Sequence, residues 1–160
     1  LLFRSPTCTE MDKRTAEKLA GIAGIVLEDL AAEMFNAGSN LKGKSAKEIC
    51  FQDFKQFTVG DTVFGVGQIN SMSSDELEDI KKKLLSYLDQ AREEHKLNMV
   101  YFMLTHILHE STELLCSGAG ARETVLEAFE LPEDMDPVVL RGVVSRKKQL
   151  IPALVSALQQ

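Results

Sequence analysis

The feature that most constrains how this chain folds is the alternation of strand-like and helix-like segments after residue 50. The strand-like patterns are at residues 53–59, 62–70, 99–104 and 139–144. The helix-like patterns are at residues 74–96 and 122–129. The pair Gly60-Asp61 predicts a hairpin turn between the first two strand-like patterns. Strands that alternate with helices are typical of α/β domains, so we expect a mixed β-sheet flanked by helices.

The first 37 residues follow a different pattern: the apolar residues 1–3 suit the end of a strand, residues 5–9 suit a turn, and two helical segments follow. Thr9 and Asp12 resemble a capping box that begins a helix reaching about Ala23, which Gly24 should end. A second helix is expected at residues 27–37. Residues 38–44 are polar, contain glycine and show no periodicity, which indicates a linker. We therefore expect a short helical N-terminal appendage, a linker at 38–44 and a domain at 45–160.

Composition excludes several classes of function. A net charge of −6 over 160 residues argues against general binding to nucleic acid or membrane surfaces, which requires a broad basic face. No stretch approaches the roughly 18 apolar residues of a membrane span. The three cysteines, Cys8, Cys50 and Cys116, are far apart and lack the paired spacing of zinc sites. Their spacing favours a reducing, cytoplasmic location.

Positive charge gathers near the C-terminal end of the chain. Residues 137–160 contain four basic residues and no acidic one, namely Arg141, Arg146, Lys147 and Lys148. We expect Ser145, Arg146 and Lys147 to form a turn between a strand at 139–144 and a helix at about 148–158. Free backbone N–H groups, the helix dipole and the basic side chains would favour an anion there. A solvated basic helix start is an equally good interpretation of the same residues.

Lys55 is a third candidate cation. It lies between Phe54 and Phe57 in the predicted strand at 53–59, so its side chain should emerge on a polar face. If that face overlooks the Arg146 turn, Lys55 joins the same anion site. Spacing along the sequence does not decide this.

Two further motifs resemble functional sites, but we prefer an interpretation without a function for each of them. Residues 38–45 match the nucleotide-binding pattern G-x-x-x-x-G-K-[ST], but a helix pattern precedes them where that loop requires a buried strand, so we interpret the match as chance. His106, His109 and Glu110 follow neither metalloprotease pattern. We interpret the histidines as residues that bind water or make their hydrogen bonds within the protein. No metal ligand is expected within the chain.

Four segments carry a resemblance that extends over essentially the whole chain. They read LLFRSPTCT, EMFNAGS, DFKQF and GVVSRKKQLIP, at residues 1–9, 33–39, 53–57 and 142–152. Together they resemble the family II, manganese-dependent inorganic pyrophosphatases of the DHH phosphoesterase superfamily. The basic segment at 142–152 is the most specific of the four.

The resemblance implies a division of the chain and a set of site residues. Residues 1–37 would be the helical tail of a truncated DHH domain, 38–44 the linker, and 45–160 the C-terminal substrate-binding domain. The substrate-binding cations of the family fall on Lys55, Arg146 and Lys147, which would serve the reaction together with Ser145. The metal ligands would lie upstream of Leu1, and His106 stands where relatives often carry an aspartate.

The same resemblance implies a function for the parent protein. It would hydrolyse pyrophosphate to two phosphates with manganese, magnesium or cobalt held by the DHH domain of the same chain, and it would be compatible with a homodimer. The fragment alone would bind no metal and would be inactive. The alternatives are a related exopolyphosphatase and a non-catalytic, anion-binding regulatory module.

Overall fold

The computed structural model describes residues 3, 8–38, 41 and 43–159. Contacts divide the chain into two compact units, residues 1–42 and 43–160. The predicted strand end at 1–3 and turn at 5–9 lie largely outside the described residues, as do positions 39, 40 and 42 of the predicted linker. Each unit is therefore considered by itself.

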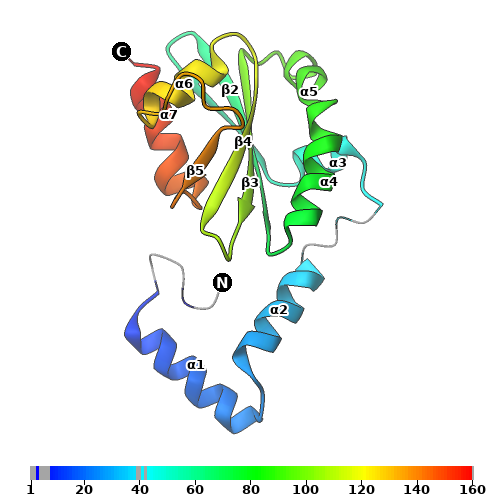
Figure 1. The fold of residues 1–160 in the computed structure, drawn as a ribbon, viewed down its shortest axis with the longest axis vertical. Helices are drawn as coiled ribbons and strands as arrows, with labels where there is room; N and C mark the ends of the chain where they lie inside the picture. Colours follow the sequence, from blue (N-terminus) through cyan, green and yellow to red (C-terminus); the bar gives the residue numbers. More distant parts are fainter. Residues whose placement is uncertain (1–2, 4–7, 39–40, 42, 160) are drawn as a thin grey trace. The chain divides into compact units, whose positions relative to one another are not determined.

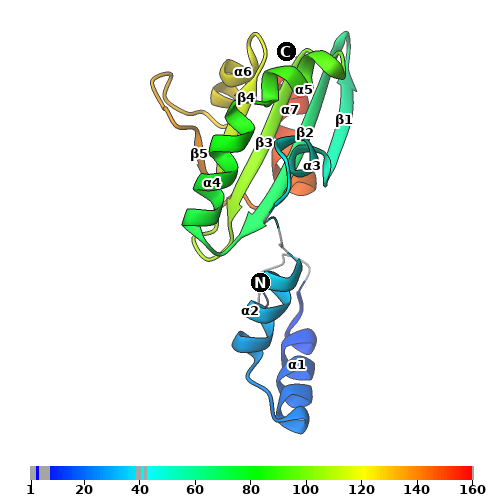
Figure 2. The same ribbon diagram turned by 90° about the vertical axis from the view of Figure 1, so that its right-hand side faces the viewer.

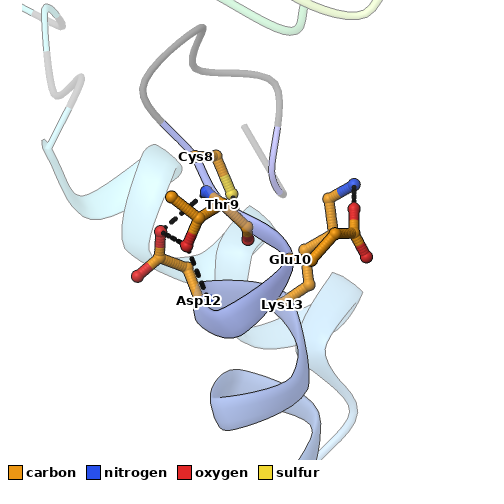
Figure 3. Close-up of polar contacts among 5 residues, drawn as sticks. All are labelled: Cys8, Thr9, Glu10, Asp12 and Lys13. Atoms are coloured by element: carbon orange, nitrogen blue, oxygen red, sulfur yellow. Dashed lines mark hydrogen bonds and ion pairs between the residues drawn. The ribbon is translucent and has the colours of Figure 1, made fainter.

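The first unit contains the two predicted helices, α1 (Glu10–Ala23) and α2 (Leu27–Gly38). Figure 3 shows the predicted capping box: Thr9 Oγ1 accepts the Asp12 N–H at 3.2 Å, and the Asp12 carboxylate accepts the Thr9 N–H at 2.8 Å. These bonds satisfy two backbone donors at the helix start and hold the pKa of Asp12 below its ordinary value. Gly24 ends α1 in the left-handed region, at φ 67°, so both predicted boundaries are confirmed.

The second unit is built on a five-stranded mixed sheet, as predicted. Its strands are β1 (Phe54–Val59), β2 (Thr62–Ser71), β3 (Met99–His106), β4 (Ser111–Ser117) and β5 (Val139–Arg141), in the spatial order β1-β2-β3-β4-β5. Only the β2–β3 pair is parallel among these strands. The predicted hairpin at Gly60-Asp61 joins β1 to β2, and β3 is the central strand that the apolar run at 99–104 predicts.

Helices cover both faces of the sheet (Figures 1 and 2). On one face lie α3 (Ala46–Phe51), α4 (Ser74–Leu85) and α5 (Leu88–Glu94). On the other lie α6 (Ala121–Ala128) and the C-terminal helix, which consists of a π-helical turn η1 (Arg146–Leu150) and α7 (Ile151–Ala157). The core beneath α6 and α7 includes Phe64, Val66, Tyr101, Met103, Leu114, Val125, Leu140, Leu150 and Leu154.

The single long helix predicted at 74–96 is wrong, because the structure divides it into α4 and α5. The break falls at Ser86 and Tyr87, where the Tyr87 N–H donates to the Leu84 carbonyl at 2.8 Å and Ser86 Oγ to the Lys83 carbonyl at 2.9 Å. These short-range bonds replace the regular helical pattern. The break allows Tyr87 and Leu88 to be buried together with Ala91.

The C-terminal strand and helix also differ from their predicted bounds. The strand expected at 139–144 ends at Arg141, since Gly142 adopts φ 74° and turns the chain away from the ladder. The helix expected from about Lys148 begins at Arg146. Strand β4 was absent from the prediction and pairs with both β3 and β5.

Two glycines of β2 permit a close approach of neighbouring groups. A Cβ at Gly67 would lie 2.5 Å from the Phe102 ring and 3.2 Å from the Cys50 carbonyl oxygen. Gly65 has no room either, because a Cβ there would lie 2.1 Å from Phe54 Cζ. The face of β2 beneath α3 is therefore packed against backbone and rings with no space for a side chain at these positions.

Within the described ranges, every helix is too short or too polar to cross a bilayer. The three cysteines are unpaired. Burial raises the pKa of the Cys50 thiol to about 12, so this thiol stays protonated and packs as a small apolar group.

Candidate anion-binding site

The basic turn follows β5 and opens the C-terminal helix. Ser145 is the N-cap residue, and its hydroxyl oxygen accepts the Lys148 N–H at 3.2 Å. The first helical turn is wide: the Leu150 N–H donates at 3.3 Å to the Ser145 carbonyl, five residues back. Pro152 follows in the next turn and has no N–H for a regular helical bond to Lys148. Arg146 and Lys147 thus occupy the first two helical positions, whose N–H groups have no carbonyl one turn back.

Gln149 fixes the backbone of this turn. Its Oε1 accepts the N–H groups of Val144 and Ser145, each at 2.9 Å, and its Nε2 donates to the Gly142 carbonyl at 2.7 Å. The Ser145 N–H and hydroxyl therefore bind within the chain, which differs from the free N–H expected at this residue. The turn is shaped by a side chain that our interpretation of the sequence overlooked.

A buried hydroxyl network connects the residues before the turn to the sheet. Thr112 Oγ1 donates to the Val143 carbonyl at 2.6 Å and lies 2.9 Å from Thr105 Oγ1. Gln68 Nε2 donates to Thr105 Oγ1 and to the Val144 carbonyl, both at 3.1 Å. Side chains of β2 and β4 thus hold the two carbonyls, and Thr105 of β3 joins these side chains to each other. Both threonines are fully buried, so the network is shielded from water.

Arg146 turns its guanidinium toward the beginning of β1. Nη1 donates at 2.6 Å to the Asp53 carbonyl and at 3.3 Å to the Val66 carbonyl, while Nη2 donates at 2.8 Å to Asp53 Oδ1. The Arg146 side chain is 11% exposed and that of Asp53 is 56% exposed. The arginine is thus held in one place against the sheet, with Asp53 at the solvent boundary.

Lys55 lies on the same face of the sheet as the Arg146 turn. It pairs with Val66, the residue whose carbonyl binds Arg146, and it follows Asp53 by two positions. Residues two apart on a strand share a face, and Phe57, two further on, packs against the core under α7. Lys55 and Lys147 are both exposed. The fold therefore brings Lys55 to the end of the sheet where Asp53 holds Arg146.

The histidine motif lies elsewhere, at the hairpin between β3 and β4. The rings of His106 and His109 stack with centroids 3.8 Å apart, and the His109 N–H donates to His106 Nδ1 at 3.3 Å. Burial and the neighbouring His109 lower the pKa of His106. Among residues 8–38, 41 and 43–159 no three His, Cys, Asp or Glu side chains gather closely enough to hold a metal ion.

The part of the nucleotide-binding match that the structure describes also lacks the required setting. A helix, α2, precedes it, and the six-residue α3 follows it. Lys44 Nζ donates to Gln52 Oε1 at 2.6 Å, and Ser45 is the N-cap of α3. Neither residue is placed as in a phosphate-binding loop, in agreement with our interpretation.

Comparisons with known proteins give a consistent result. The model of the DHHA2 domain family matches residues 32–157. A cobalt-dependent inorganic pyrophosphatase of Clostridium perfringens is 44% identical over 96% of this chain and 28% of its own length. A manganese-dependent inorganic pyrophosphatase of Methanothrix thermoacetophila is 40% identical over 100% of this chain and 52% of its own length.

A solved structure supports the same relationship. A crystal structure from Methanococcus jannaschii, of a protein assigned to the family II inorganic pyrophosphatases, superimposes with a TM-score of 0.81 at 34% identity. The match covers 99% of this chain and 52% of that one, so the chain spans about half of that structure's length. The predicted resemblance to family II pyrophosphatases is confirmed, and the chain belongs to the DHHA2 domain family.

Proposed function

We propose that this chain is the substrate-binding part of a metal-dependent inorganic pyrophosphatase that hydrolyses pyrophosphate to two phosphates. The observation that carries the proposal is the placement of Arg146 and Lys55 at one end of one sheet face, with Lys147 beside Arg146 in the first helical turn. The relatives named as pyrophosphatases support the choice of substrate.

The three cations suit the charge and geometry of pyrophosphate. Arg146 offers planar, paired N–H donors to two phosphoryl oxygens, and the ammonium groups of Lys55 and Lys147 add compact positive charge. Together they would neutralise one phosphoryl group and hold it in line with the bond to be broken. Such fixed charge contributes most when it faces the charge that develops in the transition state.

The metal belongs to another part of the proposed protein. The described residues of this chain do not fit a metal site, because they lack a cluster of three suitable ligands. Manganese or cobalt, the metals in the relatives' names, would be held by a DHH domain and would activate the attacking water. This chain by itself would be inactive.

We propose the following division of the chain: residues 1–37 as the tail of the DHH domain, 38–44 as the linker and 45–160 as the substrate-binding domain. The contact boundary at 42/43 supports it. So do the apolar side chains exposed on α1 and α2, including Met11, Leu19, Ile22 and Met34, which suit the interior of a larger domain. The parent would be cytoplasmic, with its own DHH domain as the partner and a homodimer as its assembly.

Replacing Arg146 in the full-length protein tests the proposal. Arg146→Ala should lower the rate of pyrophosphate hydrolysis by about 10²–10³-fold, while metal content, measured by elemental analysis, stays the same. Arg141→Ala is the matched control, since it removes one exposed charge from the same basic segment. Normal hydrolysis by Arg146→Ala would contradict the proposal. Parallel assays with tripolyphosphate separate a pyrophosphatase from an exopolyphosphatase.

A further inference from the structure

The guanidinium of Arg146 presents two edges, and the protein occupies only one of them. The edge formed by Nη1 and Nη2 donates two hydrogen bonds to Asp53, one to its carbonyl oxygen (2.6 Å) and one to Oδ1 (2.8 Å). The second Nη1 hydrogen goes to the Val66 carbonyl at 3.3 Å. Three of the five N–H donors of an arginine are thereby engaged.

The two remaining donors form the other edge. They are the Nε–H and the second hydrogen of Nη2, which point in the same direction because the guanidinium is planar. Within the part of the chain that the structure describes, neither has an acceptor. Two parallel N–H donors of this kind match two oxygens of one phosphoryl group.

Asp53 is well placed to fix the direction of that edge. It directly precedes β1, whose first residue, Phe54, pairs with Gly67. Gly67 is itself packed against the Phe102 ring and the Cys50 carbonyl, so the start of β1 has little freedom to move. The carbonyls of Asp53 and Val66 hold Nη1, and the Asp53 carboxylate is the only side chain of the described residues that holds Nη2.

We infer that Asp53 is a positioning residue, which orients Arg146 so that its Nε/Nη2 edge faces the phosphoryl group of the substrate. The inference rests on the proposed function. A carboxylate on the same edge of an anion-binding arginine would compete with the anion. Here it binds the opposite edge, and a phosphoryl group can bind without breaking any of the three bonds to Asp53 and Val66.

The test compares substitutions of Asp53 in the full-length protein. Asp53→Ala removes the carboxylate acceptor of Nη2 and keeps the backbone carbonyl, and we expect kcat/KM for pyrophosphate to fall roughly ten-fold because the guanidinium is displaced. Asp53→Asn keeps an oxygen acceptor and should retain most of the activity. Asp61→Asn, in the β1–β2 turn, removes the same charge far along the strand and should change kcat/KM less than two-fold. Unchanged or improved kcat/KM in Asp53→Ala would overturn the inference.

A double-mutant cycle shows whether Asp53 acts through Arg146. Asp53→Ala should cause almost no further loss of kcat/KM in an Arg146→Ala background. The same ten-fold loss in both backgrounds would mean a general structural role and would overturn the inference.

A readout without activity separates this inference from the proposed function. In ¹⁵N NMR spectra of the 160-residue chain, rotation of the Arg146 guanidinium about Nε–Cζ should be slow in the wild type and in Asp53→Asn, and at least ten-fold faster in Asp53→Ala. Equal rotation rates in the wild type and Asp53→Ala would overturn the role of Asp53. A full-length protein that does not hydrolyse pyrophosphate would contradict the proposed function alone.

Discussion

Gln149 Oε1 accepts the backbone N–H of Ser145 at 2.9 Å, so a residue one turn inside the helix fixes the residue that caps it. The same oxygen accepts the Val144 N–H, and the amide nitrogen of Gln149 donates to the Gly142 carbonyl. One side chain thus satisfies three backbone groups between β5 and η1. The shape of the basic turn depends on this amide.

Gln149→Leu keeps most of the side-chain volume and removes all three bonds. We expect the free energy of unfolding to fall by about 1–3 kcal/mol, because partly buried backbone groups lose their partners. Urea denaturation followed by circular dichroism measures the change. Gln56→Leu, at an exposed position of β1, is the control and should stay within about 0.5 kcal/mol of the wild type. Equal stability of the two variants would contradict the role of Gln149.

Thr112→Val removes a buried hydroxyl without changing the shape of the side chain. The Val143 carbonyl, now 2.6 Å from Thr112 Oγ1, would lose its donor, and Thr105 Oγ1 would keep Gln68 but lose its contact with Thr112. We expect a loss of about 1–3 kcal/mol in the free energy of unfolding. Thr58→Val, on the exposed side of β1, is the matched control and should have almost no effect. A loss as large in Thr58→Val would show that the network is not responsible.

The lowered pKa of His106 predicts that the free energy of unfolding depends on pH. Burial lowers its pKa in the folded state below the ordinary 6.5, so the unfolded chain takes up the proton first as the pH falls. Its contribution to stability is therefore complete above the unfolded pKa, decreases as the pH falls through 6.5, and is lost below the folded pKa. Replacing His106 with Asn should flatten this part of the profile of unfolding free energy against pH.

NMR titration of the His106 ring follows the same group directly. His109→Asn removes a neighbouring group that lowers the pKa of His106, so it should move the midpoint upward. An unchanged or lower midpoint would contradict the assigned cause.

Lys55 should matter for the reaction because of the sheet face on which it lies. In the full-length protein we expect Lys55→Met to lower kcat/KM for pyrophosphate by about 10²-fold, as removal of one charged contact to a phosphoryl group commonly does. Lys82→Met, on α4 across the sheet, removes the same charge from the opposite face and should leave kcat/KM unchanged. A similar loss in both variants would indicate an effect of net charge alone.

Local chemistry explains which parts of the fold were predictable. The capping box at Thr9, the hairpin at Gly60-Asp61 and the apolar strand β3 depend on residues a few positions apart. Strand β4 does not: Glu113 interrupts its apolar pattern and is paired at 2.7 Å with Lys81 of α4. The break between α4 and α5 likewise depends on burial of Tyr87, which tertiary packing decides.

The residues of the candidate site also fall into those that the sequence indicated and those that it did not. Arg146 and Lys147 stand out in the sequence as local charge, and Lys55 stands out as a lysine between two phenylalanines of a predicted strand. The family resemblance implied all three. Asp53 was missed because the hydrogen bond that gives it a role joins residues 93 positions apart. Thr112 and Val143, 31 positions apart, were missed for the same reason. The sequence around a short polar residue does not indicate which distant residue it will bind by a hydrogen bond.

The π-helical turn at Arg146–Leu150 has a consequence for the direction of the basic residues. An α-helix turns about 100° per residue, so the one additional residue in this turn rotates everything before it by about that angle relative to α7. Leu150 and Leu154 can then face the core while Arg146 faces Asp53. The wide turn therefore sets the angle around the helix axis between the apolar side of α7 and the basic residues at the start of the helix. Deleting one residue from the turn would point Arg146 away from the beginning of β1.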